Sequence, residues 1–196
     1  MEKITPEILL NAYSVGIFPM AEDASSKELH WYSPEERGII PLEGFYVPGK
    51  LRRFYNKKPF EICVDRNFRK TMELCAEPQK DRKSTWINDD IINLYCRLHE
   101  MGFAHSVECY ENNNLIGGLY GVALRGVFCG ESMFSRRTNA SKVALIKLVE
   151  LLNEKGFILL DTQYITDHLK QFGAVEISRE QYQLRLSEAL KIDVKW

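Results

Sequence analysis

The 196-residue sequence lacks any stretch that approaches the roughly 20 consecutive apolar residues of a membrane-spanning helix. The apolar N-terminal run, residues 8–18, is interrupted by Asn11, Ser14 and Gly16, and no small-residue cleavage site of a secretory signal follows it. Neither sign of charge is in clear excess, since 26 Lys and Arg stand against 27 Asp and Glu. These absences argue against a membrane protein and against a uniformly basic protein that coats nucleic acid.

Cysteine pairs at redox or metal-binding spacing are also absent. The cysteines are odd in number, with no C-x-x-C pair among Cys63, Cys75, Cys96, Cys109 and Cys129. This pattern argues against both a disulfide framework and a zinc ribbon. The four histidines are scattered, and none lies at ligand spacing beside a cysteine. We therefore expect a reduced, cytoplasmic protein without a metal ion or other cofactor.

The composition that remains is that of a folded protein, with 45% hydrophobic and 27% charged residues. Residues 19–49 contain four prolines, three glycines and several aromatic residues, a mixture that predicts an irregular segment with short extended pieces. From residue 60 onward the hydrophobic pattern becomes regular. The chain is long enough for one good-sized core or for two small lobes that share an interface.

Hydrophobic periodicity predicts alternating strands and helices in the regular part of the chain. The expected elements are a strand at 60–65, helices at 67–77 and 89–101, strands at 104–111, 114–124 and 126–134, a helix ending near 155, a strand at 157–163, a short helix, a strand at 175–177 and a helix at about 179–190. This order indicates a mixed sheet flanked by helices, an α/β or α+β fold. The run at 157–163 is nearly all apolar, which is typical of a strand buried on both faces.

Two carboxylates interrupt apolar strands. Asp161 ends the strand at 157–163, and Gln163 follows two residues later on the same predicted side, where open sheets often bind ligands. Partial burial would raise the pKa of Asp161 and favour it as a proton acceptor, although it could merely cap the helix near Thr166. Glu131 needs a partner or a function if its strand is buried, or else it faces solvent at the strand end. As neighbours, the two carboxylates would form an acidic pocket suited to a cationic substrate.

A basic segment begins at residue 50. Residues 50–83 contain 11 Lys and Arg and 5 Asp and Glu, a net charge of +6, so the rest of the chain carries −7. A segregated basic patch with interleaved aromatic residues suits a nucleic-acid backbone and a stacked base, although a solvated charged face is the alternative. The densest part is KLRRFYNKK, whose basic residues are Lys50, Arg52, Arg53, Lys57 and Lys58.

Three aromatic residues lie in predicted loops. Trp31, Tyr32 and Trp86 could stack on a terminal adenine. Equally, they could pack the irregular segment against the rest of the protein. The sequence leaves both alternatives open.

Several longer segments together resemble one protein family. AYSVGIFPM, WYSPEERGIIP, RLHEMGFAHSVE, GGLYGVALRGVFCGESMFSRRTNASKVAL and LLDTQYITDHLKQFGAVEISRE follow in the order seen in leucyl/phenylalanyl-tRNA–protein transferases. The resemblance extends from about Leu10 to Tyr182. The chain departs from the family pattern where Met20 and Tyr32 replace tryptophans and Thr166 replaces an asparagine. Many members also carry a segment ahead of the A-Y-x-x-G-I-F-P element, at which this chain almost begins.

The resemblance implies an enzyme that takes leucine or phenylalanine from aminoacyl-tRNA. It would join that amino acid by a peptide bond to the N-terminus of a protein beginning with Arg or Lys, which marks the protein for N-end-rule degradation. The resemblance also implies a small N-terminal lobe, here residues 1–49, followed by an acetyltransferase-like (GNAT) domain, here residues 50–196. The implied partners are aminoacyl-tRNA and protein substrates, without DNA or a membrane.

The resemblance also places functional residues. The pocket for the Leu or Phe side chain falls at Leu119, Phe128, Met133 and Leu160, and the terminal adenosine near Tyr32, Trp86 and Glu131. Under one hypothesis Asp161, positioned with Gln163, accepts a proton from the attacking amine, directly or through a relay, while Glu131 orients the substrates. Under the alternative, the ester is already activated and the site works mainly by positioning.

Two other functions compete with this one. An acyl-CoA-dependent N-acetyltransferase of the same fold would need a [QR]-x-x-G-x-[GA] turn ahead of a helix to bind pyrophosphate, and the sequence lacks it. An RNA-binding module without catalysis would use only the basic patch and the aromatic residues. That module would leave the pair Glu131 and Asp161 unexplained.

Overall fold

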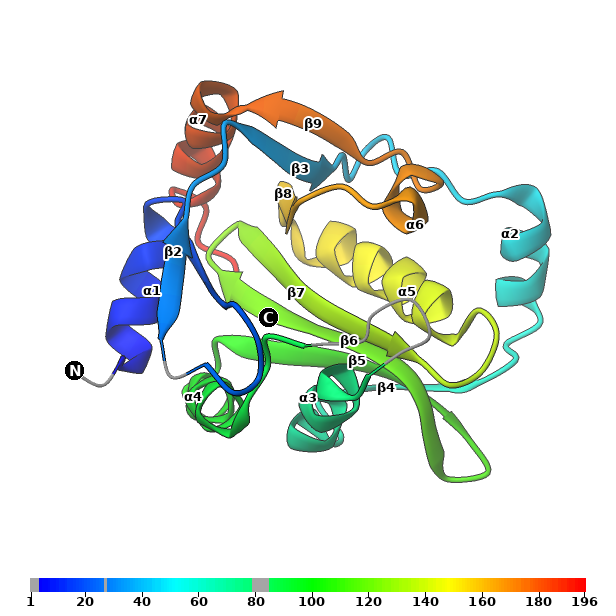
Figure 1. Cartoon of the computed structure of the whole chain (residues 1–196). Coiled ribbons are helices and arrows are strands. Elements are labelled where there is room, and N and C mark those ends of the chain that lie inside the picture. Colours follow the sequence, from blue (N-terminus) through cyan, green and yellow to red (C-terminus); the bar gives the residue numbers. More distant parts are fainter. Residues whose placement is uncertain (1–3, 27, 79–84) are drawn as a thin grey trace.

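The computed structural model describes residues 4–26, 28–78 and 85–196. In them, a seven-stranded sheet has the order β4-β5-β6-β7-β8-β3-β9, and β1 and β2 form a separate hairpin. Helices lie on both faces of the large sheet (Figure 1). The elements are α1 (Pro6–Ser14), β1 (Phe18–Ala21), β2 (Leu29–Tyr32), β3 (Glu36–Ile40), α2 (Gly49–Asn56), β4 (Glu61–Val64), α3 (Phe68–Ala76), α4 (Asp89–Glu100), β5 (Ala104–Glu111), β6 (Asn114–Leu124), β7 (Val127–Ser135), α5 (Ala140–Lys155), β8 (Leu159–Gln163), α6 (Asp167–Lys170), β9 (Val175–Ser178) and α7 (Arg179–Ala189).

Local sequence signals set the ends of these elements. The Thr5 hydroxyl accepts a hydrogen bond from the amide of Ile8 and caps α1. Asn112 and Asn113 adopt left-handed backbone angles, with φ of 51° and 62°, in the tight turn between β5 and β6. Gly156, with φ of 84°, ends α5. The predicted mixed sheet flanked by helices is confirmed.

Two hydrophobic cores lie on opposite faces of the sheet. Neighbouring strand residues alternate between them, so that Val127 and Cys129 join the core under α1, α3, α4 and α7, while Phe128 joins the core under α5. Leu51 anchors α2 and Leu169 anchors α6 in this second core. The central strands are therefore buried on both faces, as the apolar run at 157–163 predicts.

The parallel strands β7 and β8 pair over only a short distance. Val127–Cys129 of β7 lie opposite Leu159–Asp161 of β8, and among the described residues their pairing ends there. Beyond this point β7 stays with β6, while β8 stays with β3 on its other side. The two strands therefore diverge, with α5 behind the opening and α6 beside it (Figure 1).

Strand β3 belongs to the large sheet although it comes from residues 1–49. It pairs antiparallel with both β8 and β9, with Ile39 opposite Asp161 and Val175. The N-terminal part of the chain thus contributes directly to the sheet that carries Asp161. The division into residues 1–49 and 50–196 stays a prediction.

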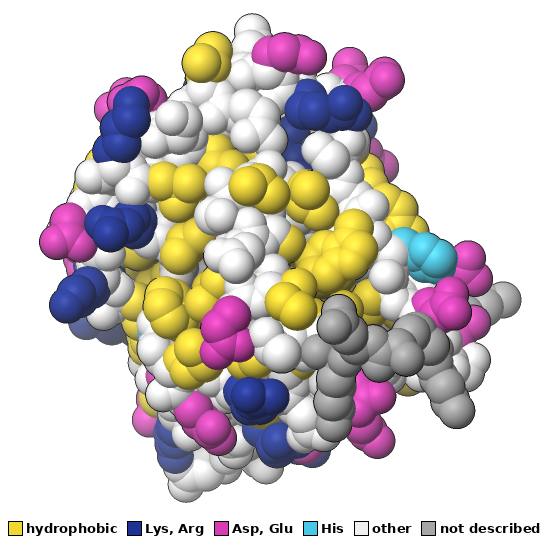
Figure 2. Space-filling view, turned by 90° about the vertical axis from the view of Figure 1, so that its left-hand side faces the viewer, with side chains coloured by type: hydrophobic (Ala, Val, Ile, Leu, Met, Phe, Trp, Pro, Cys, Tyr) yellow, Lys and Arg dark blue, Asp and Glu magenta, His cyan; other side chains and the backbone are white. Residues whose placement is uncertain are grey.

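The side of the molecule that carries α1 and β2 has an apolar centre. Figure 2 shows hydrophobic side chains gathered in the middle of this face and charged ones mostly around its edge. Ile8 of α1 and Trp31 of β2 are 44% and 41% exposed. Trp31 is therefore not packed into a core.

In the described part of the chain, every helix is too short or too polar to cross a membrane.

Candidate active site

A cavity of about 570 Å³ lies where β7 and β8 diverge. Its lining is mainly apolar and includes Leu119, Met133 and Leu160 from the strands and Leu145 and Leu148 from α5. A volume of this size is within the range of small-molecule sites, roughly 300–1,000 Å³. The structure thus brings three of the four residues predicted for the aminoacyl pocket to one cavity.

Phe128, the fourth of these residues, is not among the lining residues. Its side chain is fully buried and packs over Gly121, where an added Cβ would lie 2.4 Å from the ring. The ring of Trp196 lies on it as well, with the two ring centroids 5.3 Å apart. Phe128 shares a core with Leu119 and Leu160, and so supports the wall of the cavity.

Glu131 lines the same cavity and is held by three side chains. Its Oε1 accepts hydrogen bonds from the hydroxyl of Tyr13 at 2.7 Å and from Nε2 of Gln163 at 2.9 Å. Its Oε2 accepts a longer bond, 3.3 Å, from the hydroxyl of Tyr95. Burial raises the pKa of Glu131 to about 7, and the charge of Asp161 adds to this, although the three hydrogen bonds act to lower it. A pKa near neutral pH is the value that suits general acid–base catalysis best.

Asp161 lies behind Gln163, away from the cavity. Its Oδ1 accepts from Nε of Arg37 at 2.8 Å and from the backbone amide of Gln163 at 2.8 Å. Its Oδ2 accepts from Nη2 of Arg37 at 2.6 Å and from the hydroxyl of Tyr182 at 2.9 Å. The side chain is 0% exposed and is not part of the cavity lining. Asp161 is thus connected to the cavity through Gln163.

Arg37 holds Asp161 in a buried bidentate ion pair. Its guanidinium lies between the rings of Phe18 and Tyr182, 4.5 Å and 4.4 Å from their centroids, and its Nη1 donates to the carbonyl of Gly16. Only 2% of the residue is exposed. Such planar, two-point pairing is specific to arginine. Arg37 therefore joins the N-terminal part of the chain, β8 and α7 at one point.

The backbone of Gln163 aims its amide group at Glu131. Gln163 is left-handed, with φ of 60°, at the end of β8, and the opposite strand shifts register between Gly38 and Ile39. A Cβ at Gly38 would lie 2.9 Å from the Thr162 hydroxyl, so this turn requires glycine. The strict alternation that predicts Asp161 and Gln163 on one side of the strand ends here. Strain of this kind is frequent at functional sites.

The residues predicted to bind adenosine are partly brought together. Trp86 and Glu131 line the cavity, whereas the ring of Tyr32 stacks on Phe18, at 6.0 Å between centroids, and is not among the lining residues. Thr162 and His168 also line the cavity, and within the described residues the buried Oγ1 of Thr162 and Nε2 of His168 have no hydrogen-bond partner. Burial and the charge of Lys142 lower the pKa of His168, which keeps its imidazole neutral at pH 7.

The predicted tRNA-binding residues lie on α2 and the turn after it, at the end of the molecule opposite α1 (Figure 1). Arg52 is half-buried and pairs with Glu150 at 3.7 Å, and the other four are exposed. Residues 79–83, the last part of the basic segment, lie outside the described residues. The exposed residues of this α2 patch are Lys50, Arg53, Lys57 and Lys58.

Metal-ligand side chains gather elsewhere. The cavity lining contains a single carboxylate, that of Glu131, among the described residues. In the same part of the chain, one group of His, Cys, Asp or Glu side chains close enough to share a metal ion is formed by Asp65, His99 and His105. These residues are not part of the cavity lining.

Residues 39–187 match the family model described as leucyl/phenylalanyl-tRNA protein transferase, and residues 2–35 match the N-terminal domain model of the same family. The chain belongs to this family. A leucyl/phenylalanyl-tRNA–protein transferase of Paramagnetospirillum magneticum is 54% identical over 190 residues, which cover 97% of this chain and 91% of that protein. The predicted family is thereby confirmed.

Solved structures of other proteins superpose on this chain at low sequence identity. FemX superposes with a TM-score of 0.53 at 14% identity, over 90% of this chain and 70% of FemX. L-PGS from Bacillus licheniformis gives a TM-score of 0.49 at 12% identity, over 94% of this chain and 70% of that one. The likeness to FemX, together with the arrangement of the sheet, confirms the predicted GNAT-like fold.

The site also contains residues that the sequence reasoning missed. Tyr13 and Tyr95 carried no signal, because aromatic residues at helical spacing are usually core residues. Arg37 did carry a signal, since it is a charged residue at the start of the apolar run RGII. The same reasoning that singled out Glu131 applies to it.

Proposed function

We propose that the protein transfers leucine or phenylalanine from aminoacyl-tRNA to the N-terminal α-amino group of proteins that begin with Arg or Lys, and so marks them for N-end-rule degradation. The observation that carries this proposal is an apolar cavity that also contains the Glu131–Gln163 pair. The name of the Paramagnetospirillum magneticum relative specifies the same aminoacyl groups. Because the reaction uses aminoacyl-tRNA, we propose the cytoplasm as its place.

The cavity suits an apolar aminoacyl side chain. Each methylene group buried among its leucines and Met133 contributes about 0.8 kcal/mol, whereas a polar side chain would lose its hydrogen bonds to water there. Trp86, which lines the same cavity, offers a ring on which the terminal adenine can stack. The site thereby selects leucine and phenylalanine by hydrophobicity and size.

The reaction is the aminolysis of an ester. The neutral α-amine of the acceptor attacks the ester carbonyl, and a C–N bond forms as a tetrahedral oxyanion develops. The bond from that carbon to the 3′-oxygen of the tRNA then breaks. The amine loses one proton, and the departing oxygen gains one. The net products are a peptide bond and a free 3′-hydroxyl.

Glu131 is the carboxylate that reaches the substrates in this proposal. Its Oε1 is occupied by Tyr13 and Gln163, while Oε2, with one bond of 3.3 Å, has capacity for the acceptor amine. Near neutral pH it can attract the ammonium group and take up its proton. Asp161, enclosed by Arg37 and Tyr182, acts through Gln163 as a positioning residue. In this proposal the proton acceptor is therefore Glu131, and Asp161 serves only to position the site.

One assay tests the proposed function directly. Labelled Leu-tRNA and Phe-tRNA are supplied separately with a peptide that begins with Arg, in the absence of coenzyme A. We expect label in the peptide, and none when the N-terminal amine is acetylated. Incorporation that depends on acetyl-CoA instead of tRNA would overturn the proposal, and tRNA binding without any transfer would indicate an RNA-binding module.

Replacing Met133 with tryptophan should reduce transfer of phenylalanine more than transfer of leucine. Met133 is a partly exposed lining residue, so the larger ring can occupy the cavity without displacing the core. We expect a fall in kcat/KM of about tenfold for Phe-tRNA, since one methylene group changes selectivity by roughly 1–3 kcal/mol. The measurement is kcat/KM for both tRNAs, with Met133→Leu as control. Equal loss for both tRNAs would contradict this assignment of the cavity.

Neutralising the α2 patch should weaken tRNA binding and flatten its salt dependence. The triple variant Arg53→Gln, Lys57→Gln and Lys58→Gln removes three exposed charges, so the slope of log K against log [salt] should fall by up to about 2–3 units. A matched triple variant at Arg125, Lys155 and Lys191, which are exposed elsewhere, should keep the wild-type slope. Equal slopes for the two triple variants would count against the patch.

A further inference from the structure

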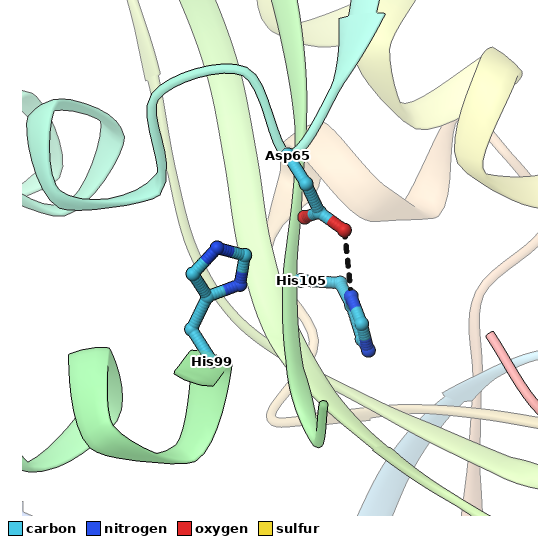
Figure 3. A group of neighbouring side chains, drawn as sticks. All are labelled: Asp65, His99 and His105. Atoms are coloured by element: carbon cyan, nitrogen blue, oxygen red, sulfur yellow. Dashed lines mark hydrogen bonds and ion pairs between the residues drawn. The ribbon is translucent and has the colours of Figure 1, made fainter. Parts of the chain in front are cut away.

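Asp65, His99 and His105 converge from three separate segments. Asp65 follows β4, His99 lies in the last turn of α4 and His105 is the second residue of β5. Figure 3 shows the three side chains gathered in the space between these segments. One ligand-type atom from each lies within 4.8 Å of the others. The group lies outside the proposed catalytic cavity.

One nitrogen of each imidazole is hydrogen-bonded to a backbone carbonyl. Nδ1 of His99 lies 2.7 Å from the carbonyl oxygen of Ala104, and Nε2 of His105 lies 3.1 Å from that of Gly102. A carbonyl oxygen only accepts, so each of these nitrogens carries a proton. If both rings are neutral, Nε2 of His99 and Nδ1 of His105 are unprotonated, and each carries a lone pair that can bind a metal ion.

The third member of the group is also an acceptor. Oδ2 of Asp65 lies only 2.7 Å from Nδ1 of His105, and it accepts a further bond of 3.2 Å from the indole of Trp196. The other oxygen is fixed by the backbone amide of Ser106 at 2.7 Å. Two lone pairs do not face each other at 2.7 Å unless a positive charge lies between or beside them. Asp65, His99 and His105 each contribute one ligand-type atom to this group.

We propose that Asp65, His99 and His105 form a binding site for a divalent transition-metal ion, with Zn²⁺ as the best match. Two imidazole nitrogens and a carboxylate oxygen are a ligand set of this ion, and water would complete the tetrahedron. The carbonyl bonds of both histidines are the outer contacts that usually orient metal-binding imidazoles. Ligands of one Zn²⁺ ion are about 3.3 Å apart, so small side-chain rotations from the present separations suffice.

The bound ion would join β4, α4 and β5 at the β4–β5 edge of the sheet, which is far in the strand order from β8. Ring stacking already fixes two of the ligands, since His99 lies on Phe68 at 4.5 Å and His105 on Trp196 at 4.7 Å between centroids. The ion is therefore structural, and it leaves the chemistry at Glu131 unchanged. Any metal that binds the folded state alone raises its stability.

The test is a titration of the chelator-treated full-length protein with Zn²⁺, followed by calorimetry. We expect one ion per chain, a rise in Tm and at least a tenfold weaker affinity in His99→Gln and in Asp65→Asn. His30→Gln is the matched control, because His30 is exposed and has a carboxylate neighbour, Glu22 at 3.9 Å, without a third ligand. This control should bind as the wild type does.

Nitrogen NMR spectra of the wild-type protein provide a measurement that does not depend on the folding of variants. One equivalent of Zn²⁺ should shift the ring nitrogens of His99 and His105 and leave those of His30 and His168 in place. The proposal is overturned if Zn²⁺ shows no saturable binding, if both ligand variants bind as tightly as the wild type, or if His30 or His168 shifts instead. If Zn²⁺ shows no saturable binding, a proton on Nδ1 of His105 that is shared with Oδ2 of Asp65 explains their short distance.

Discussion

Replacement of Arg37 by methionine is expected to lower the free energy of unfolding by about 3–5 kcal/mol, the usual cost of leaving a buried charge without its partner. Methionine retains much of the apolar stem of Arg37, but it removes the guanidinium that lies between Phe18 and Tyr182 and leaves Asp161 without its bidentate donor. The loss should appear as a shift of the urea midpoint at pH 7, measured by circular dichroism. Transfer activity should fall as well, because Gln163 depends on Asp161 for its orientation.

A second substitution separates the charge from the shape of this site. Adding Asp161→Asn to the Arg37→Met background removes the unpaired charge, so the double variant should be more stable than Arg37→Met alone. The matched control is Arg66→Met, since Arg66 is an exposed arginine paired with Glu61 at 3.0 Å, and such pairs contribute about 0–1 kcal/mol. If Arg37→Met costs no more than Arg66→Met, the buried pair is not what holds β8 in place.

Replacement of Glu131 by glutamine should lower kcat by about 10²–10⁴-fold, the range found for groups that take part in proton transfer. The amide keeps the size of the side chain but cannot carry the negative charge that attracts the acceptor ammonium. Single-turnover rates at saturating aminoacyl-tRNA and peptide, from pH 5.5 to pH 8.5, measure the effect. The wild-type rate should rise as Glu131 ionises around pH 7, whereas the variant should keep only the rise that comes from deprotonation of the substrate's α-amine, whose pKa is about 7.7–8.0.

The stability of the Glu131→Gln variant gives an independent check on the same pKa. The folded state raises the pKa of Glu131 from 4.5 to about 7, so it binds this proton more tightly than the unfolded chain does. The resulting stabilisation is complete below pH 4.5 and is lost as the pH rises through 7. Compared with the wild type, Glu131→Gln should therefore gain stability between pH 4.5 and pH 7. Glu154→Gln, an exposed control on α5, should show the same dependence of stability on pH as the wild type. If Glu131→Gln shows that dependence too, the pKa of Glu131 is not raised in the folded state.

Local features of this fold were predictable from the sequence because their causes are local. The Thr5 cap, the Asn112–Asn113 turn and the stop at Gly156 each depend on a few neighbouring residues. The apolar lining of the cavity at Leu119, Met133 and Leu160 followed from the family resemblance.

The contacts that build the site are long-range, and no periodicity predicts them. Arg37 and Asp161 are 124 residues apart, and Tyr13 and Glu131 are 118 apart. The turn at Gln163 also breaks the alternation on which strand predictions rely. The sequence therefore indicated both carboxylates. Only the folded arrangement shows that Glu131 lines the cavity, whereas Asp161 is buried behind Gln163.

The short pairing of β7 with β8 has a further thermodynamic consequence. The hydrogen-bonded ladder that joins the two halves of the sheet runs through only three residue pairs at this point. Gly130 and Met133 on one half and Thr162 and Tyr164 on the other line the cavity between them, so a molecule that fills this cavity would contact both halves. The affinity of the cavity for its ligand and the stability of the pairing between the two halves of the sheet are therefore linked. A ligand that binds only the paired state stabilises the pairing, and a stronger pairing raises the affinity by the same free energy.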